Sequence, residues 1–445
     1  MPNIALVVLD TLRKDFFDEH FDWLPGRRFE RAYSTSHRTV PAHASLFTGR
    51  YASELGVGGD TNRVPADRPL LAERLRDAGY STRAFSANPY ISEQFGYDRG
   101  FGEFGGSWRL ESFDPDLFDW GVFIANAQDE GASKYLRALR DCVASDCDTL
   151  RSLRHGATLK LYDAGVGPFD VDDGAKAALK TVRRTSFGSE EFLFVNLMEA
   201  HAPYNPPADY RTADEPEFDG ISATIAGETD IDRARLRRAY DDSVRYLSDV
   251  YREIFAELRT DFDCVVTLAD HGELLGEHGA WNHCYGVFPE LTHVPLTVWT
   301  GEDGVRRDET VVSLLDVHRT VLDLAGVSGE SRGRSLLDDP ESGTFLAEYR
   351  GLTPRQRDRL AGDGVPRSTL ESFDEPLDGL AAPEDYYGYE TRDGFVETGT
   401  AAVPDPRERL AELREEVPRA DPTGRTAAGE PSEAVLQQLD DLGYT

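Results

Sequence analysis

Short apolar runs recur along the chain, and each is followed by polar residues. Four runs are apolar on both faces of an extended strand and cover Ile4–Leu9, Phe192–Leu197, Cys264–Leu268 and Val294–Trp299. A weaker run covers Thr82–Phe85. Runs of this length without a polar face are typical of strands buried within a mostly parallel sheet. We therefore predict that these segments build one central sheet.

Helical spacing is found between the apolar runs. Apolar residues three and four positions apart extend from Leu236 to Leu258 and predict one long amphipathic helix. Shorter helices are predicted over Leu71–Ala78 and over Val311–Leu324, each followed by a glycine. Strands that alternate with helices predict the fold class: α/β, a sandwich with a mostly parallel central sheet flanked by helices.

Two regions depart from this alternation. Residues 105–184 are rich in aromatic residues and glycine, including Trp108 and Trp120. We interpret them as an insertion over the sheet edge that lines the substrate entrance. Beyond Tyr349 the composition shifts to Pro, Gly, Asp and Arg. We predict a catalytic domain over residues 1–345, insertion included, and a smaller C-terminal subdomain over residues 346–445.

The charge of the chain restricts its partners and its surroundings. Asp and Glu number 81 against 48 Lys and Arg, for a formal net charge of -33. Nucleic acids and anionic membranes bind basic surfaces, so neither is expected as a partner. At about 1 M salt the screening length is only ~3 Å, which suits an acidic, lysine-poor surface. We therefore predict a halophilic protein, with an ordinary acidic protein as the alternative. We also predict a cytoplasmic location, since no signal peptide or membrane-spanning run is visible.

Polar residues directly follow three of the predicted strands. Asp10 follows the first, Glu199-Ala200-His201 the second and Asp270-His271-Gly272-Glu273 the third. Open α/β sheets place their functional sites at the carboxyl ends of strands. Any one of these segments could be an ordinary turn. However, a carboxylate beside an imidazole suits a divalent metal, and a glycine allows close backbone approach.

A hydroxyl group precedes a further predicted helix. Pro41 is well placed in the first turn, Thr39 stands just ahead of it, and Gly49 is a natural stop. Thr39 could simply cap this helix. A helix N-terminus also stabilises negative charge, which favours an alkoxide or a bound oxyanion at the same place.

Together these segments resemble the sulfatase family of the alkaline phosphatase superfamily. Leu9–Arg13 looks like the family's first metal-binding motif, Thr39–Arg50 like its nucleophile signature and Leu268–Gly279 like its second metal motif. The resemblance covers nearly the whole chain. It implies an alkaline-phosphatase-like sandwich and a hydrolase of sulfate esters.

Three positions depart from the family pattern. Thr39 stands where sulfatases carry a cysteine that becomes formylglycine, and threonine cannot be modified in this way. Relatives that act on phosphate esters use a threonine directly, so the departure also favours phosphate esters. His43 replaces the arginine of the signature, and Thr11 replaces the second aspartate of the first metal motif.

The resemblance implies one divalent cation. Its ligands would be Asp10, Asp270 and His271, with the Thr39 oxygen completing the set. Such ligands suit Ca²⁺, Mn²⁺ or Mg²⁺, and the histidine leaves Zn²⁺ open. Thr39 would attack the sulfur or phosphorus in line and form a covalent ester that water then hydrolyses.

Four more side chains complete the predicted site. His43 would orient or stabilise the nucleophile. His201 and His283 would bind the ester oxygens or protonate the leaving group, although His283 could instead only pack beneath the sheet. Arg13 would help to bind the anionic ester, or pair with a surface acid.

Three functions remain open at this stage. The favoured one is a metal-dependent hydrolase of sulfate esters or of closely related phosphate mono- or diesters, with a sulfated glycan as one conceivable substrate. The second is a transferase that passes the phospho- or sulfo-group to an acceptor other than water. The third is a binding protein that has lost turnover. The sequence does not indicate the oligomeric state.

Overall fold

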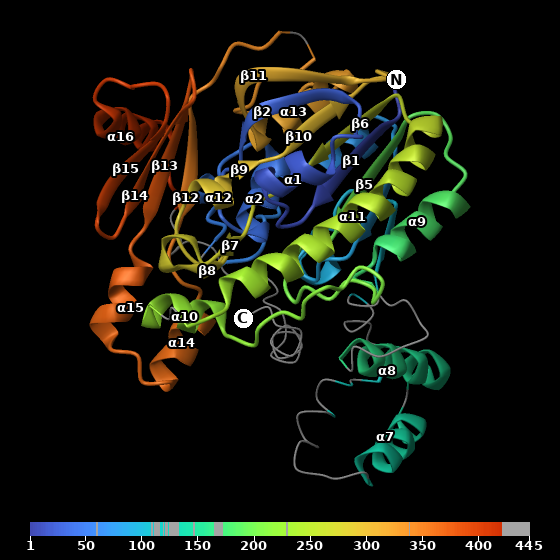
Figure 1. The fold of residues 1–445 in the computed structure, drawn as a ribbon. Coiled ribbons are helices and arrows are strands. Elements are labelled where there is room, and N and C mark those ends of the chain that lie inside the picture. The colour runs from blue at the N-terminus through green and yellow to red at the C-terminus, as the bar shows by residue number, and fades with distance from the viewer. Residues whose placement is uncertain are drawn as a thin grey trace.

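A nine-stranded sheet forms the centre of the molecule (Figure 1). In spatial order its strands are β11 (Val305–Ser313), β2 (Gly26–Tyr33), β10 (Leu296–Trp299), β6 (Cys264–Leu268), β1 (Ile4–Leu9), β5 (Glu191–Leu197), β3 (Ser81–Ser86) and β4 (Glu103–Gly106), while β9 (His293–Val294) pairs with β2. The strands β6, β1, β5, β3 and β4 are all parallel, and β10 runs antiparallel to both of its neighbours. The predicted fold class, α/β with a mostly parallel central sheet, is confirmed.

The computed structural model describes residues 1–420, apart from residues 59–60, 108–109, 111–115, 119, 121–122, 124–132, 146, 164–171, 228–229 and 338. Trp108 and residues 421–445, which belong to the predicted insertion and C-terminal subdomain, lie outside this description. Within it, no helix is both long enough and apolar enough to cross a membrane.

Helices cover both faces of the sheet (Figure 1). One layer contains α1 (Lys14–His20), α9 (Ala175–Arg184) and α11 (Arg233–Asp261), and the other contains α2 (Thr39–Thr48), α4 (Leu71–Asp77) and α13 (Leu314–Leu324). The long helix α11 buries the apolar positions that recur at three- and four-residue steps, as its sequence predicts. The shorter elements are α3 (Ala52–Leu55), α7 (Ser133–Ala144), α8 (Thr149–Asp163), α10 (Gly220–Ala226), α12 (Pro289–Thr292), the ribbon β7 (Leu274–Leu275) and β8 (Trp281–Asn282), and two 3₁₀ turns, Glu93–Phe95 and Glu277–Gly279.

A second, antiparallel sheet follows the first along the chain. It consists of β12 (Phe345–Tyr349), β13 (Leu377–Ala382), β14 (Tyr386–Thr391) and β15 (Gly394–Gly399), with α14 (Pro354–Gly362), α15 (Arg367–Asp374) and α16 (Pro406–Glu416) beside it. A bridge between Ser36 and Glu348 ties β12 to the segment that leads into α2. The boundary predicted between residues 345 and 346 falls within β12, and the division into two domains itself stays a prediction.

Two sequence-based elements differ from the structure. The run Val294–Trp299 is divided at Pro295 into β9 and β10, because proline cannot donate to the ladder. The helix predicted over Val311–Leu324 begins only at Leu314. Its first three residues complete β11, and Ser313 caps the helix by accepting a hydrogen bond from Leu315 N–H.

Residues 105–184 contain more helix than their weak periodicity suggests. They include α7, α8 and α9, and α9 packs against α11 in one of the helical layers that cover the central sheet. This last helix is therefore part of the framework. The interpretation of the remaining residues as an insertion near the substrate entrance stays a prediction.

Candidate active site

Three predicted metal ligands meet at one edge of the central sheet. Val8 of β1 is paired with Leu268 of the parallel β6, so Asp10 and Asp270 each follow two residues later and leave the sheet side by side. His271 Nε2 lies 3.4 Å from Asp270 Oδ2 and 3.8 Å from Asp10 Oδ1. All three side chains are buried, and their ligand atoms lie within 4.8 Å of one another.

The chemistry of this cluster fits a divalent cation. Asp10 Oδ1 and Asp270 Oδ2 are buried and accept no hydrogen bond from the described residues. Burial, together with the charge of Asp270, raises the pKa of Asp10 to about 7. Burial lowers the pKa of His271 to about 4, so its imidazole is neutral near pH 7. Its Nδ1 lies 2.9 Å from Gly272 O and donates there, which leaves the Nε2 lone pair facing the two carboxylates.

The backbone around His271 is fixed by a close approach. A Cβ atom at Gly272 would lie 2.0 Å from the carbonyl oxygen of Glu290, and Gly272 N–H donates to Leu291 O over 2.8 Å. Only glycine fits at this position. The close backbone approach predicted at Gly272 therefore comes from α12, and it holds the ligand that precedes it.

Two asparagines hold Asp10, and the sequence analysis did not assign them to the site. Asn88, just after β3, donates to Asp10 Oδ2 over 2.8 Å, and Asn196 within β5 lies 3.4 Å from the same oxygen. The signal for Asn196 was present, since it is the one polar residue in the apolar run Phe192–Leu197. Thr11, which replaces an aspartate of the family pattern, donates its N–H to Asp270 Oδ1 over 3.3 Å.

Thr39 is the first residue of α2 and points at the cluster. Its Oγ1 lies 3.2 Å from His271 Nε2, and the side chain is buried. The N-cap position belongs to Arg38, and no side chain caps the helix. Because the hydroxyl is not used as a cap, the structural alternative for Thr39 loses its support. Gly49 ends the helix in the left-handed conformation, as predicted.

His43 lies one helical turn after Thr39 and is fully buried. Its Nδ1 is 3.0 Å from Thr39 O and 3.4 Å from Asp270 Oδ2, while its Nε2 is 3.3 Å from Asn196 Nδ2. Burial alone would lower the pKa of His43, but the ion pair with Asp270 raises it above the usual value. His43 thus contacts the peptide oxygen of Thr39 and fixes the start of α2 relative to Asp270.

His283 and His201 lie beside the cluster. The His283 ring is 4.7 Å from that of His271 and 5.1 Å from that of His201, measured between centroids. His283 Nδ1 lies 3.1 Å from Glu273 Oε1, and Tyr204 donates to the other oxygen of Glu273. Burial would lower the pKa of His283, but Glu273 raises it above the usual value. Glu273 is therefore a positioning residue of this site.

Arg13 is paired in a way that does not suit its predicted contact with substrate. Its guanidinium donates to both oxygens of Asp15, to Glu277 Oε1 and to Glu273 O. These bonds occupy all three guanidinium nitrogens and neutralise the charge. The alternative, pairing with acids, is the arrangement that the structure shows, and Arg13 braces the loop that carries Glu273.

Comparison with known proteins assigns the family. The family model described as Sulfatase matches residues 2–327. The chain belongs to the sulfatase family. As a member of this family it is an enzyme that hydrolyses sulfate or phosphate esters, as its sequence predicts. Members of the superfamily bind a divalent metal, and the cluster of Asp10, Asp270 and His271 offers a site for one.

Individual relatives of this sulfatase-family chain are distant. An uncharacterized sulfatase, YidJ, of Escherichia coli (strain K12) is 25% identical over 368 residues, which cover 73% of this chain and 68% of the relative. The low-salt glycan biosynthesis sulfotransferase Agl7 of Haloferax volcanii is 33% identical over 145 residues, which cover 30% of this chain and 32% of that protein. The crystal structure of a phosphonate monoester hydrolase of Agrobacterium radiobacter has the same fold, with a TM-score of 0.63, 18% identity and coverage of 94% and 96% of the two chains.

Proposed function

We propose that this chain hydrolyses sulfate esters in a metal-dependent reaction in which Thr39 serves as the nucleophile in place of formylglycine. One observation carries the proposal: Thr39 Oγ1 lies 3.2 Å from His271 Nε2, in the same buried cluster as Asp10 Oδ1 and Asp270 Oδ2. A hydroxyl with no structural role thus stands beside a ligand set that suits a divalent cation.

The residues around Thr39 support an in-line attack. Asp10, Thr39, Asp270 and His271 would hold the cation, which when bound lowers the pKa of an oxygen nucleophile and neutralises charge on the ester. Thr39 Oγ1 attacks sulfur opposite the leaving oxygen, so that one S–O bond forms as the other breaks. The N-terminus of α2 stabilises negative charge on the attacking oxygen. Since His271 Nε2 cannot both bind a cation and accept a proton, the proton of Thr39 passes to solvent.

The leaving group needs a proton when it is an alkoxide, and His283 is placed to supply it. Glu273 holds His283 through Nδ1 and favours the imidazolium form. After transfer, the neutral imidazole accepts a proton from the water that attacks the sulfur of the Thr39 ester. The bond between sulfur and Thr39 Oγ1 breaks, Oγ1 takes a proton from solvent to restore the hydroxyl, and sulfate leaves. His201, beside His283, is proposed to bind the ester oxygens.

A substrate panel with two Thr39 variants tests the proposal. Aryl sulfates, phosphate mono- and diesters and phosphonate esters are assayed in multimolar KCl after chelation, with Mn²⁺, Ca²⁺, Mg²⁺ or Zn²⁺ added back. We expect sulfate esters to be the best substrates, Thr39→Ala to abolish turnover and Thr39→Ser to retain part of it. Intact-mass analysis of acid-quenched enzyme should show a sulfuryl group on Thr39. Undiminished activity of Thr39→Ala rules out this nucleophile, and a preference for phosphate esters reassigns the substrate.

A transferase is the second candidate, and one observation favours it. The relative from Haloferax volcanii is named a sulfotransferase, although the match covers only 30% of this chain. A sulfuryl or phosphoryl group on Thr39 could pass to an acceptor hydroxyl instead of water, with the same bonds formed and broken on the protein. Product that forms only with an added acceptor, such as a glycan, would select this function. A sulfuryl or phosphoryl group detected on Thr39, whether it then passes to water or to an acceptor, excludes a binding protein without turnover.

A further inference from the structure

Arg38, the residue before Thr39, carries a charge that no described residue balances. It forms no ion pair and no hydrogen bond within the part of the chain that the structure describes, and its Nε is buried without a partner. The groups that act on its charge are the hydroxyls of Tyr90 and Tyr349 and the thiol of Cys284. Burial raises the pKa of each of these groups, so all three are neutral at pH 7.

The lack of a carboxylate partner for Arg38 among the described residues is unexpected, because the chain is rich in acids. Asp and Glu outnumber Lys and Arg by 81 to 48, and the other buried arginines near the site find acids. Arg13 pairs with Asp15 and Glu277, and Arg350 pairs with Glu348 and with Asp378. A guanidinium remains charged even where burial disfavours the charge. An unbalanced, partly buried cation destabilises the fold, so its presence points to a ligand.

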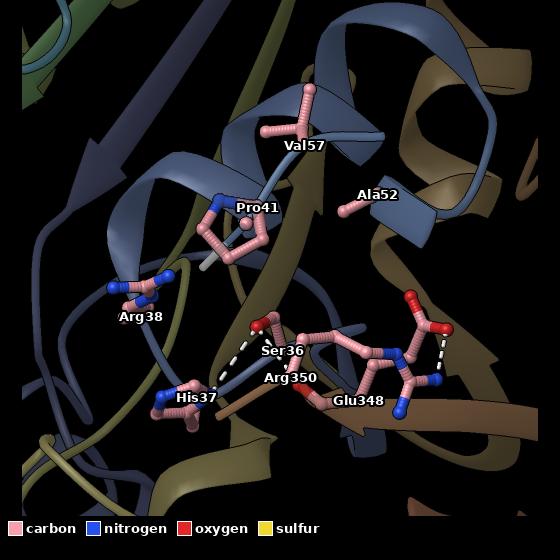
Figure 2. A pocket seen from close by; sticks show the side chains of 9 residues that line it. Ser36, His37, Arg38, Pro41, Ala52, Val57, Glu348 and Arg350 are labelled. Atoms are coloured by element: carbon pink, nitrogen blue, oxygen red, sulfur yellow. Dashed lines mark hydrogen bonds and ion pairs between the residues drawn. The ribbon is translucent and has the colours of Figure 1, made fainter. Parts of the chain in front are cut away.

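Arg38 lines a small pocket of about 10 Å³ that opens to solvent (Figure 2). Ser36, His37, Glu348 and Arg350 also line it. Glu348 is neutralised by Arg350 and also accepts from Ser53 N–H, while the Ser36 hydroxyl donates to Glu348 O. Burial and the charge of Arg38 hold the pKa of His37 well below its usual value, so this ring is neutral. The charge left over in the pocket is therefore positive.

The pocket is adjacent to the reacting group but separate from it. Arg38 has an extended backbone, with φ -151 and ψ 164, whereas Thr39 begins α2. Consecutive side chains at such a junction point in different directions. The hydroxyl of Thr39 faces His271, and Thr39 is not among the residues that line the pocket.

We propose that Arg38 binds a second oxyanion of the substrate, a carboxylate or a further sulfate group, next to the ester that Thr39 attacks. The substrate class is thus an ester that carries at least one additional anionic group. This inference rests on the proposed function for the position of the reacting ester. A planar guanidinium suits it, because its paired N–H groups match the geometry of an oxyanion.

The experiment compares matched aryl sulfates whose ring carries a carboxamide, a carboxylate or a sulfonate. Arg38→Met removes the charge and keeps the length of the side chain, and Arg38→Lys keeps the charge. For the carboxylate and sulfonate substrates we expect Arg38→Met to raise KM by about tenfold to a hundredfold. The carboxamide substrate should keep its KM, and kcat should change little for all three. The melting temperature of Arg38→Met should be unchanged or higher, because no structural partner is lost.

Controls separate this inference from the proposed function. Arg319→Met on α13 removes the same charge from an arginine paired with Asp323, and it should affect the three substrates equally. Calorimetric titration with an unreactive aromatic disulfonate and the matching monosulfonate measures binding without turnover. Tighter binding of the disulfonate that depends on Arg38 supports this site even if no sulfate is hydrolysed. An equal loss for all three substrates, or no loss with any, overturns it.

Discussion

At the scale of single residues, the site contains buried carboxylate oxygens whose burial destabilises the fold. Asp10 Oδ1 and Asp270 Oδ2 are buried without hydrogen bonds, and burial beside Asp270 raises the pKa of Asp10 to about 7. Unpaired buried carboxylates destabilise a protein. The contacts from Asn88, Asn196 and Thr11 go to the opposite oxygens, whereas His43 Nδ1 lies 3.4 Å from Asp270 Oδ2.

Loss of the Asn88 side chain should weaken cation binding specifically. Asn88 donates to Asp10 Oδ2 over 2.8 Å and so fixes the carboxylate orientation. Contacts of this kind typically contribute about 10- to 100-fold to metal affinity, so we expect Asn88→Ala to raise the Kd for Mn²⁺ by that factor. Saturating Mn²⁺ should restore most of kcat. Titration calorimetry on chelated protein measures the Kd, with Asn205→Ala as the control, since Asn205 pairs with Arg211 instead. An unchanged Kd would contradict this role.

His283 should matter most for esters with poor leaving groups. If it protonates the leaving oxygen, His283→Ala should slow an alkyl sulfate by about 10²- to 10⁴-fold and 4-nitrophenyl sulfate far less. Glu273→Gln is the informative partner variant. Glu273 raises the pKa of His283, so its loss should lower that pKa, and alkyl sulfate turnover should then decline at lower pH than in the wild type. Steady-state rates over pH 5–9 test both variants, and an equal loss for both substrates would exclude a proton donor.

At the scale of helices and strands, the apolar runs located the strands that carry the site. The runs that begin at Ile4, Phe192 and Cys264 correspond to β1, β5 and β6, because a strand buried on both faces has few polar positions. The pattern of apolar runs does not predict β2, because this strand contains Arg27 and Arg28. Both are buried: Arg27 pairs with Asp308, and the Arg28 guanidinium lies over the Phe17 ring. Partners this distant in sequence cannot be read from local pattern.

The residues of the site likewise divide into those that the local sequence indicates and those whose role depends on distant contacts. Asp10, Asp270 and His271 are predicted because they directly follow apolar runs, and Thr39 because the segment around it resembles the nucleophile signature of the sulfatase family. The importance of Glu273 and Arg38 was missed. Glu273 acquires its role through His283, and Arg38 through the lack of an ion-pair partner among the described residues. Such roles depend on three-dimensional contacts, or on their absence, and the linear order of residues does not show them.

The start of α9 predicts a dependence of stability on pH. Ala175 N–H donates to Glu199 Oε1 over 2.7 Å, while Glu199 Oε2 is buried without a partner in the described chain. Burial, then the charges of Asp172 and Asp173, raise the pKa of Glu199 well above its usual value. The folded state therefore retains a proton that the unfolded state loses at about pH 4.3. Stability should fall as the pH rises from there towards the folded pKa.

Glu199→Gln imitates the protonated form and should flatten this pH dependence. Urea unfolding midpoints are measured between pH 5 and pH 8. The midpoint of the variant should increase relative to that of the wild type as the pH rises. Glu257→Gln is the control, because Glu257 forms an exposed ion pair with Arg183 of the same helix. Parallel curves for Glu199→Gln and the wild type would show that Glu199 is ionised in the folded protein.

At the scale of the whole molecule, two sheets contribute to one active-site region. The central sheet supplies the cation ligands and positions Thr39. Glu348 of β12 and Arg350, just after it, line the same pocket as Arg38, and Arg350 pairs with Glu348 and with Asp378 of β13. The segment Ser36–Arg38 lies between the two sheets and is bonded to β12 at Glu348. The second sheet is thus positioned to shape the substrate pocket.

The formal charge of -33 predicts that the stability of this molecule depends on the salt concentration. Screening has opposite effects on its charges, since salt weakens surface ion pairs but also relieves repulsion among acids. The 81 acidic residues exceed the 48 basic ones, so relief of repulsion should dominate. The screening length falls from about 10 Å at 0.1 M salt to about 3 Å at 1 M. We therefore expect the melting temperature to rise steeply with KCl up to about 1 M and then more slowly, as the halophilic prediction requires.

Choline chloride should act like KCl in this range and sucrose should not, because only ions screen charge. A melting temperature that is constant or falls with KCl would mean that ion pairs dominate, and the halophilic prediction would be wrong.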